Sequence, residues 1–399
     1  MKIKSIWLGC LFFLLLLAHL QIHVSAEDIT RNEEMLQIED AEQTEDIRQI
    51  EESLVEEFDF DSLDDGVAKL LPESKLTFKN LFRNVMKGDF ESVKELFLKT
   101  VSDQFFYELH YHKQTFVRMI FIALVAALLS NFSNAFQNRQ VTDVCFYILY
   151  LLLLTLCLSS FRIAMDEVDA QLQTINEFMQ ILCPTYFLSV AIAVGGNTSI
   201  VFYHIVLFTI YLVELVIISL VMPAIHIYIM IQMMDHLSTE EVFTQLTELI
   251  EKMIIWSLKG MTALIIGVDM IQRLLSPAMD SLSRSIITKS AEAVPAIGDA
   301  LSGSTEILLG TAVLIKNSIG ITGVIVCLLI MVIPMFKMGC MVLLFKLASA
   351  IVQPISDKRI TGCITSVSKG GELLLRVLYT VTLLFLLTIA IVATTTHIS

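Results

Sequence analysis

Few ionisable side chains lie within the apolar segments of this sequence that are predicted to cross a membrane. The candidates that we single out are Glu214, Lys259, Asp269 and Lys346. A charge at bilayer depth costs at least about 2.5–3.5 kcal/mol on insertion scales, so such a residue faces a bundle interior or a partner. We interpret the four as a candidate charge pair or pathway, with Lys259 or Lys346 as the partner of Glu214. A structural ion pair, a role in coupling or conduction, and a position near the membrane interface are the open alternatives.

A second candidate site is the long connection 276–316, within the basic segment 273–316. Ser276-Pro277 is typical of a helix start, and Pro295 and several glycines interrupt the pattern after it. Irregular backbone at membrane depth persists only where it is buried in protein or lines a wet cavity. We predict a re-entrant or docking segment here, with an ordinary cytoplasmic loop carrying interfacial helices as the alternative. The residues that mark the segment are Pro277, Pro295, Gly298, Asp299 and Gly303.

The motifs of common catalytic and nucleotide-binding sites are missing from the sequence. It contains no H-E-x-x-H, no G-x-S-x-G and no P-loop. Gly298-Asp299 comes near the glycine-x-glycine-aspartate motif of intramembrane aspartyl proteases, but Ala296 stands where the first glycine is needed. Almost all of the seven cysteines lie in apolar runs without a C-x-x-C pair, which is typical of small buried side chains. We therefore predict no enzyme activity, no cofactor and no metal site.

The elements that must position these residues are membrane helices. Hydrophobic residues make up 55% of the chain and charged residues only 17%, which indicates an integral membrane protein with an all-α transmembrane bundle. The multi-span domain is predicted over 116–399. Its eight apolar segments are 116–136, 144–161, 178–194, 200–221, 254–271, 317–336, 338–352 and 373–393. If 200–234 is one long helix, or 317–352 one bent helix, the count falls to seven or six.

The N-terminal quarter is predicted to be exported. Residues 1–26 resemble a signal peptide, with Lys2 and Lys4 before an apolar run and small residues before a cleavage point after Ala26. An uncleaved anchor is the alternative. Residues 27–66 are strongly acidic, which is typical of a disordered arm or of a contact for a basic extracytoplasmic partner; nothing in the arm suggests nucleic-acid binding. Residues 67–115 are predicted to form amphipathic helices that lie on the bilayer surface or pack on the spans.

The distribution of basic residues predicts the orientation of the spans. With an exported N-terminal region and eight crossings, the basic segments 273–316 and 358–376 both lie in the cytoplasm. The acidic stretch 235–251 and the C-terminus then lie outside. Within the acidic stretch, Ser238 and Glu241 form a capping-box pattern that predicts the start of a long helix.

Small residues in the segment 317–336 indicate a close helix contact. Ser318 and Thr322 are four residues apart, and Gly320 and Gly323 flatten a neighbouring face. Glycines tolerated in an ordinary span are the alternative. Gly339 has a leucine four positions on and begins no G-x-x-x-G motif.

Residues 270–399 carry a family resemblance. The matching stretches are Val294-Pro295-Ala296-Ile297-Gly298-Asp299, Leu314-Ile315-Lys316-Asn317-Ser318-Ile319-Gly320-Ile321-Thr322-Gly323-Val324, Pro334 and Gln353-Pro354, followed by the apolar C-terminal helix. They resemble the stage III sporulation protein AE family of endospore-forming bacteria. The resemblance implies a non-catalytic, multi-pass subunit of a channel complex between mother cell and forespore, placed in the mother-cell membrane around the forespore. The implied partners are ring-forming membrane proteins and a cytoplasmic ATPase that supplies the energy.

A different class of function is a self-contained secondary transporter or exporter permease. Several spans with isolated charges favour it, and an inverted repeat would support it, but the two halves show no clear internal match. Copurification with ring-forming partners distinguishes the first class, and substrate flux through the purified protein alone distinguishes the second.

Overall fold

The structure is a computed structural model of the 399-residue chain. It describes residues 60–70, 77–89, 91–94, 139–194, 196–237, 242–291, 298–354 and 356–395, with the isolated residues 117, 121 and 125. The chain divides into two units, Met1–Glu57 and Phe58–Ser399, and the described residues all belong to the second. The predicted signal peptide, most of the acidic arm and nearly all of the segment 116–136 therefore lie outside the described residues.

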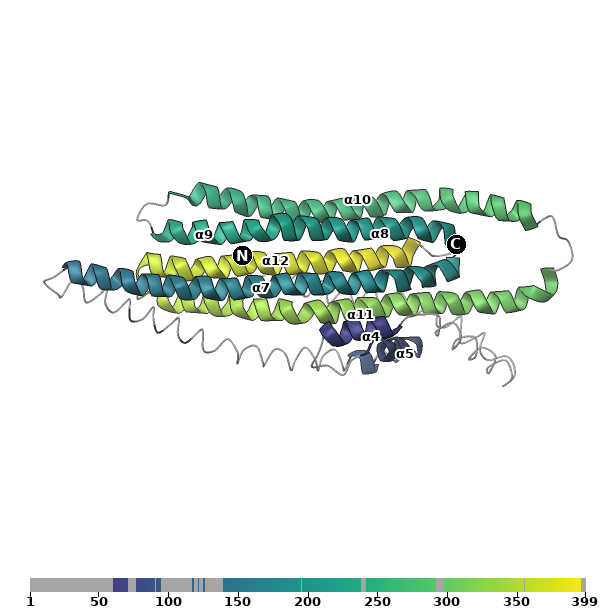
Figure 1. The fold of residues 1–399 in the computed structure, drawn as a ribbon, viewed down its shortest axis with the longest axis horizontal. Coiled ribbons are helices and arrows are strands. Elements are labelled where there is room, and N and C mark those ends of the chain that lie inside the picture. Colours follow the sequence, from purple (N-terminus) through teal and green to yellow (C-terminus); the bar gives the residue numbers. More distant parts are fainter. Residues whose placement is uncertain are drawn as a thin grey trace. The chain divides into compact units, whose positions relative to one another are not determined.

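Long helices make up most of the described part of the chain, which contains no strand and confirms the all-α prediction. Figure 1 shows them running alongside one another. They are α7 (Arg139–Val194), α8 (Gly196–Val216), the π-helical turn η1 (Ile217–Val221), α9 (Met222–Leu237), α10 (Thr244–Ala291), α11 (Gly298–Val352) and α12 (Lys358–Thr395). Since α8, η1 and α9 follow without a break, they form one continuous helical rod.

Side-chain contacts show which helices run in opposite directions. The hydroxyl oxygens of Ser349 on α11 and Thr365 on α12 lie 2.8 Å apart. Lys346 of α11 forms an ion pair with Glu372 of α12. The residue numbers of the contacting pairs rise along α12 as they fall along α11, so the two helices are antiparallel. His236 of α9 lies beside Gly362 of α12, and Ile229 lies beside Gly370, so α9 is also antiparallel to α12.

Helix α12 lies in the centre of the bundle. It packs against α7, α9, α10 and α11. Its N-terminal half carries serines, threonines and glycines among fully buried apolar residues, and its C-terminal half is strongly apolar. The fully buried apolar residues are Ile360, Cys363, Ile364, Val367, Leu374, Val377, Leu378 and Leu384.

The prediction of separate spans at 144–161 and 178–194 is wrong, because both segments belong to α7. The polar stretch between them contains neither proline nor glycine, so nothing in it ends the helix. The alternatives in which 200–234 and 317–352 are single helices are confirmed. Within the described residues, four segments are long and apolar enough to cross a membrane: Tyr147–Ile192, His204–His236, Gly310–Val352 and Lys358–Ala390.

The segment 276–316 is helical where the structure describes it, and its role as a re-entrant or docking segment stays a prediction. Pro277 lies within α10, Gly298 is the first residue of α11, and Asp299 and Gly303 lie inside α11. A glycine in a helix interior costs only about 1 kcal/mol relative to alanine, so neighbouring turns can continue the helix through it. Pro295 lies outside the described residues.

The continuity of α11 changes the predicted orientation. Its 55 residues correspond to a length of about 80 Å at 1.5 Å per residue, far more than the roughly 30 Å of a bilayer core. The basic segments 273–316 and 358–376 therefore lie at opposite ends of one helix. Their common assignment to the cytoplasm required two crossings between them, whereas α11 provides one.

Two short amphipathic helices pack on the bundle. Helix α4 (Phe60–Leu70) contacts α7, and α5 (Phe78–Met86) contacts α11. Of the two, α5 lies in the part of the chain predicted to form amphipathic helices, and it packs on the protein's own spans. Helix α4 begins inside the segment predicted to be disordered. The helix forms because one of its faces is apolar and buried; this face consists of Phe60, Leu63 and Val67.

We predict that the α9–α10 and α11–α12 connections lie on the same side of the membrane. His236 near the end of α9 contacts Gly362 near the start of α12, so the two connections lie at the same end of the bundle. Cysteines introduced by Val242→Cys and Lys358→Cys, in a chain without its native cysteines, should react with an impermeant maleimide from one side. A reporter after Ser399 should behave as belonging to the other side. Labelling of the two cysteines from opposite sides would restore the eight-span scheme.

Candidate functional site

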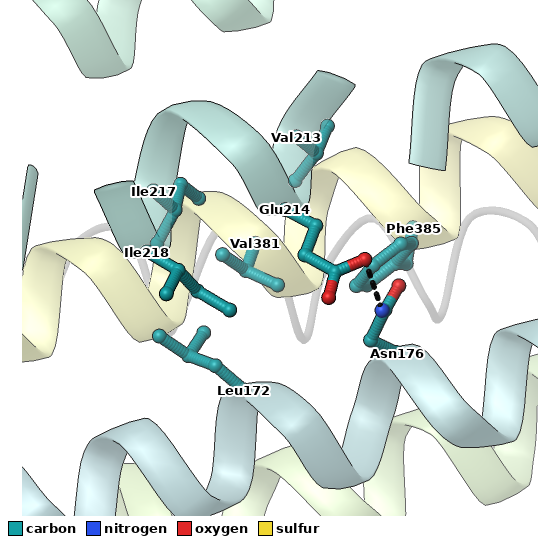
Figure 2. A pocket seen from close by; sticks show the side chains of 8 residues that line it. All are labelled: Leu172, Asn176, Val213, Glu214, Ile217, Ile218, Val381 and Phe385. Carbon is teal, nitrogen blue, oxygen red and sulfur yellow. Dashed lines mark hydrogen bonds between the residues drawn. The ribbon is translucent and has the colours of Figure 1, made fainter. Parts of the chain in front are cut away.

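The carboxylate of Glu214 lies between α8 and α7, half-buried in the described bundle. The amide of Asn176, on α7, donates a hydrogen bond to it, with a distance of 2.6 Å from Nδ2 to Oε2. Asn176 is only 6% exposed, and its Oδ1 atom has no hydrogen-bond partner. Figure 2 shows the two side chains pointing toward each other from facing helices.

A small pocket surrounds this contact. Its free volume is about 10 Å³, which is room for about one water molecule. Apart from Asn176 and Glu214 the lining is apolar and comes from α7, α8, η1 and α12. The apolar lining residues are Leu172, Val213, Ile217, Ile218, Val381 and Phe385. The polar contact is therefore held in an environment of low polarity.

The helix changes its hydrogen-bonding pattern directly after this site. Residues Ile217–Val221 form a π-helical turn, and Ile217 and Ile218 line the pocket. Such turns are rare within α-helices and are frequent at functional sites. The combination of an acidic side chain, an unpartnered amide oxygen and a π-helical turn makes this the strongest candidate site in the described residues.

The predicted lysine partners of Glu214 are placed elsewhere. Lys346 forms an ion pair with Glu372 of α12, and Lys259 is exposed on α10. Asn176 occupies the place that a lysine was expected to fill. The side chain of Asp269 lies outside the described residues, and a role of these four residues in a pathway remains a prediction.

A second ion pair between helices links α7 to α11. Lys337 pairs with Glu167, and both side chains are about one quarter exposed. Glu167 belongs to the polar stretch between the segments 144–161 and 178–194, which were predicted as separate spans. The helix explains the pairing, because a continuous α7 brings Glu167 beside α11.

Close contacts at glycines hold the long helices together. A Cβ atom on Gly320 would lie 2.8 Å from the hydroxyl oxygen of Tyr186, and one on Gly323 would lie 2.8 Å from Leu182 Cδ2. The predicted close approach at these two glycines is therefore confirmed, with α7 as the neighbour.

Sequence reasoning missed the tighter contacts along α12. A Cβ atom on Gly371 would lie 2.6 Å from Val342 Cγ2 of α11. One on Gly370 would meet Ile229 of α9 and, at 2.7 Å, Phe161 Cε2 of α7. The adjacent glycines in this predominantly apolar chain were an available signal for this contact.

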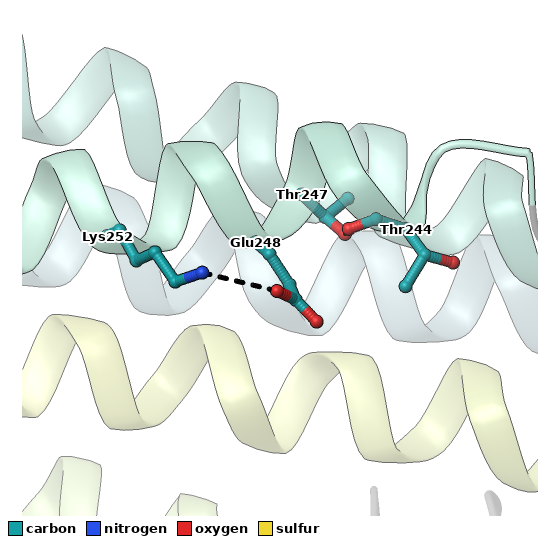
Figure 3. A network of polar contacts seen from close by, with 4 residues as sticks. All are labelled: Thr244, Thr247, Glu248 and Lys252. Atoms are coloured by element: carbon teal, nitrogen blue, oxygen red, sulfur yellow. Dashed lines mark hydrogen bonds and ion pairs between the residues drawn. The ribbon is translucent and has the colours of Figure 1, made fainter.

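The start of α10 is held by α9. Asp235 is 5% exposed and accepts hydrogen bonds from the backbone N–H of Phe243, at 2.7 Å, and from the Thr244 hydroxyl, at 2.9 Å. Helix α10 begins at Thr244, whereas the capping box predicted at Ser238 lies outside the described residues. The Lys252 ammonium and the Glu248 carboxylate lie 3.3 Å apart, and Figure 3 shows this pair on α10. Both side chains are exposed, so water screens the pair and it contributes little to stability.

Comparisons with known proteins identify the family of the chain. The family model described as stage III sporulation protein AE matches residues 76–396. The chain belongs to the stage III sporulation protein AE family. The stage III sporulation protein AE of Bacillus subtilis (strain 168) is 27% identical over 327 residues, which cover 82% of this chain and 81% of the relative. No solved structure matches the chain.

The family match extends well beyond the residues that first indicated it. It includes α5 and all of the long helices α7 to α12. Together with the four segments able to cross a bilayer, it identifies this AE-family chain as a multi-pass membrane protein of a sporulation family.

We predict opposite effects for alanine at different glycines of this AE-family chain. Gly370→Ala and Gly371→Ala should lower the thermal unfolding temperature in detergent, because overpacking costs about 1–3 kcal/mol and outweighs a helix-propensity gain of up to about 1 kcal/mol. Gly339→Ala is the matched control, since no atom lies within 4 Å of its added Cβ and only the gain remains. Equal effects at the three positions would contradict the close packing of α12.

A charge exchange tests the pair between Lys346 and Glu372. Either Lys346→Glu or Glu372→Lys should lower stability by about 1–3 kcal/mol, because a partly buried charge loses its partner and faces a like charge. The double exchange should restore most of the loss in a thermal unfolding assay. The same exchange at Glu248 and Lys252 should change stability by less than about 0.5 kcal/mol. Failure of the double variant to recover would show that the pair is not the stabilising contact.

Proposed function

We propose that this chain is a non-catalytic membrane subunit of the sporulation channel complex that links mother cell and forespore. In this role it lies in the mother-cell membrane around the forespore and is required for spore development after engulfment. The observation that carries the proposal is the family match over residues 76–396, because that range contains the whole helical bundle.

The filled centre of the bundle supports a subunit rather than a self-contained transporter. Helix α12 occupies the centre, and Ile364, Val367 and Leu374 are fully buried there against its neighbours. The pocket beside Glu214 has room for about one water molecule. A wide conduit would then be formed with other chains of the complex.

An apolar face on α10 supports contact with lipid or with other subunits. Leu246, Leu249, Met253 and Trp256 follow helical spacing, and Trp256 is 77% exposed. Helix α10 is not among the four segments apolar enough to cross a bilayer on hydropathy alone. An exposed stripe of this kind on an amphipathic helix suits a protein partner as well as lipid.

The source of energy follows from the family resemblance. The sequence has no P-loop, and the resemblance implies a separate cytoplasmic ATPase in the same complex. In this proposal the chain neither binds nucleotide nor performs chemistry, and the ring-forming membrane proteins are its direct neighbours.

Complementation and copurification test the proposed role. The chain, with a C-terminal affinity tag, is expressed in a sporulating host whose own AE-family gene is deleted, and heat-resistant spores are counted. We expect the count to rise at least about tenfold over an empty vector, and crosslinked ring-forming partners to copurify.

The matched control is a tagged membrane protein of similar abundance from the same cells, which should recover none of these partners. Rescue without any partner, combined with solute flux through the purified chain in liposomes, would overturn the proposal and favour the transporter.

A further inference from the structure

The Asn176 side chain uses only one end of its amide in the described bundle. Its nitrogen donates a hydrogen bond to Glu214 Oε2 across 2.6 Å, whereas its Oδ1 atom is buried and has no partner among the described residues. The residue is 6% exposed, so bulk water does not cover this oxygen. Buried polar atoms in folded proteins are nearly always hydrogen-bonded, either to protein groups or to ordered water. The oxygen therefore requires a donor in the pocket beside it.

The pocket beside Asn176 and Glu214 has the size and the acceptors for one water molecule. Its free volume of about 10 Å³ is close to the smallest that holds a water. A water molecule has two O–H donors, and the pocket presents two acceptors, Asn176 Oδ1 and the Glu214 carboxylate, whose oxygens each accept more than one hydrogen bond. We propose that this pocket binds one ordered water molecule, which donates to both side chains and bridges α7 to α8.

The rest of the pocket wall determines how the water is oriented. The other lining residues have apolar side chains, so within the pocket the water has two side-chain partners, the lower limit for a buried water. Both of its O–H groups are then directed at the two acceptors. Ile217 and Ile218 of the π-helical turn belong to this wall, as Figure 2 shows. The water therefore lies where the rod departs from the α-helical pattern.

The pocket fits a water molecule better than a metal cation. Calcium takes about six to eight oxygen ligands, and magnesium demands a nearly octahedral shell. The pocket presents the oxygens of one carboxylate and one amide among apolar side chains, with room for about one water molecule. These oxygens and one water are too few for either metal, whereas they match the two donors of a single water.

Hydroxyl-radical labelling by X-rays tests the site in the full-length protein in detergent. Ionising X-rays convert water into hydroxyl radicals, which react with the nearest side chains before they diffuse away. Phe385 lines the pocket and is 3% exposed, whereas Phe161 is 2% exposed and does not line it. In buffer made with heavy-oxygen water, peptide mass spectrometry should show a heavy hydroxyl on Phe385 at least about tenfold above that on Phe161, because only Phe385 lies beside an internal water.

Two variants test which group holds the water. Asn176→Leu replaces the amide with an apolar side chain of similar size, so the label on Phe385 should fall to the level of Phe161. Ser189→Ala is the matched control and should leave the label unchanged. Ser189 is a polar residue of α7 that is 1% exposed, donates to the backbone carbonyl of Tyr186 and does not line the pocket.

Either of two results would overturn the water site. Equal labelling of Phe385 and Phe161 in the wild-type protein would show that the pocket is dry. A label on Phe385 that persists undiminished in Asn176→Leu would show that the amide oxygen holds no water. If this variant fails to fold, as judged by circular dichroism, the wild-type ratio still decides the question. The water site does not rest on the proposed membership of the channel complex, since no readout depends on spore yield or copurified partners.

Discussion

The close approach of three helices to α12 is the constraint on which the rest of the bundle depends. Gly370 lies against α7 and α9, and Gly371 lies against α11, so a single turn of α12 is packed from three sides. Between helices in lipid there is little hydrophobic driving force, and contact between closely approaching backbones supplies the attraction. The polar first half of α12 becomes the interior of the bundle, where its serines and threonines bond to helix carbonyls.

This packing also determines which charges meet. With α11 antiparallel to both α7 and α12, Lys337 faces Glu167 and Lys346 faces Glu372. Both lysines are therefore paired across helix contacts. Glu214 lies on a helix whose neighbour presents an amide instead, and this difference in partner separates it from Glu167 and Glu372.

The sequence predicted the membrane helices well and their connections poorly, for a physical reason. Composition and apolar length report burial in lipid or protein, so α8 to α12 were recognised as apolar segments. A polar stretch such as 162–177 reads as an aqueous connection, yet its residues form helix readily and Glu167 finds a partner on α11. The pairing of Glu214 was missed because it depends on helix register, which hydropathy does not contain. The close contact at Gly320 and Gly323 was predicted because small residues in an apolar segment indicate a close helix contact without knowledge of the partner helix.

The π-helical turn after Glu214 links the site to the shape of the helix. A π-helical turn accommodates an extra residue in the hydrogen-bond ladder, and Ile217 and Ile218 of this turn form part of the pocket wall. The hydrogen bond from the Asn176 amide to Glu214 is the polar contact within this otherwise apolar wall, and the pocket beside it has room for about one water molecule. Because the turn departs from the α-helical hydrogen-bonding pattern, the residues after it face other neighbours than an unbroken α-helix would present. The turn and the polar contact therefore act together in determining how α8 packs against α7 and α12.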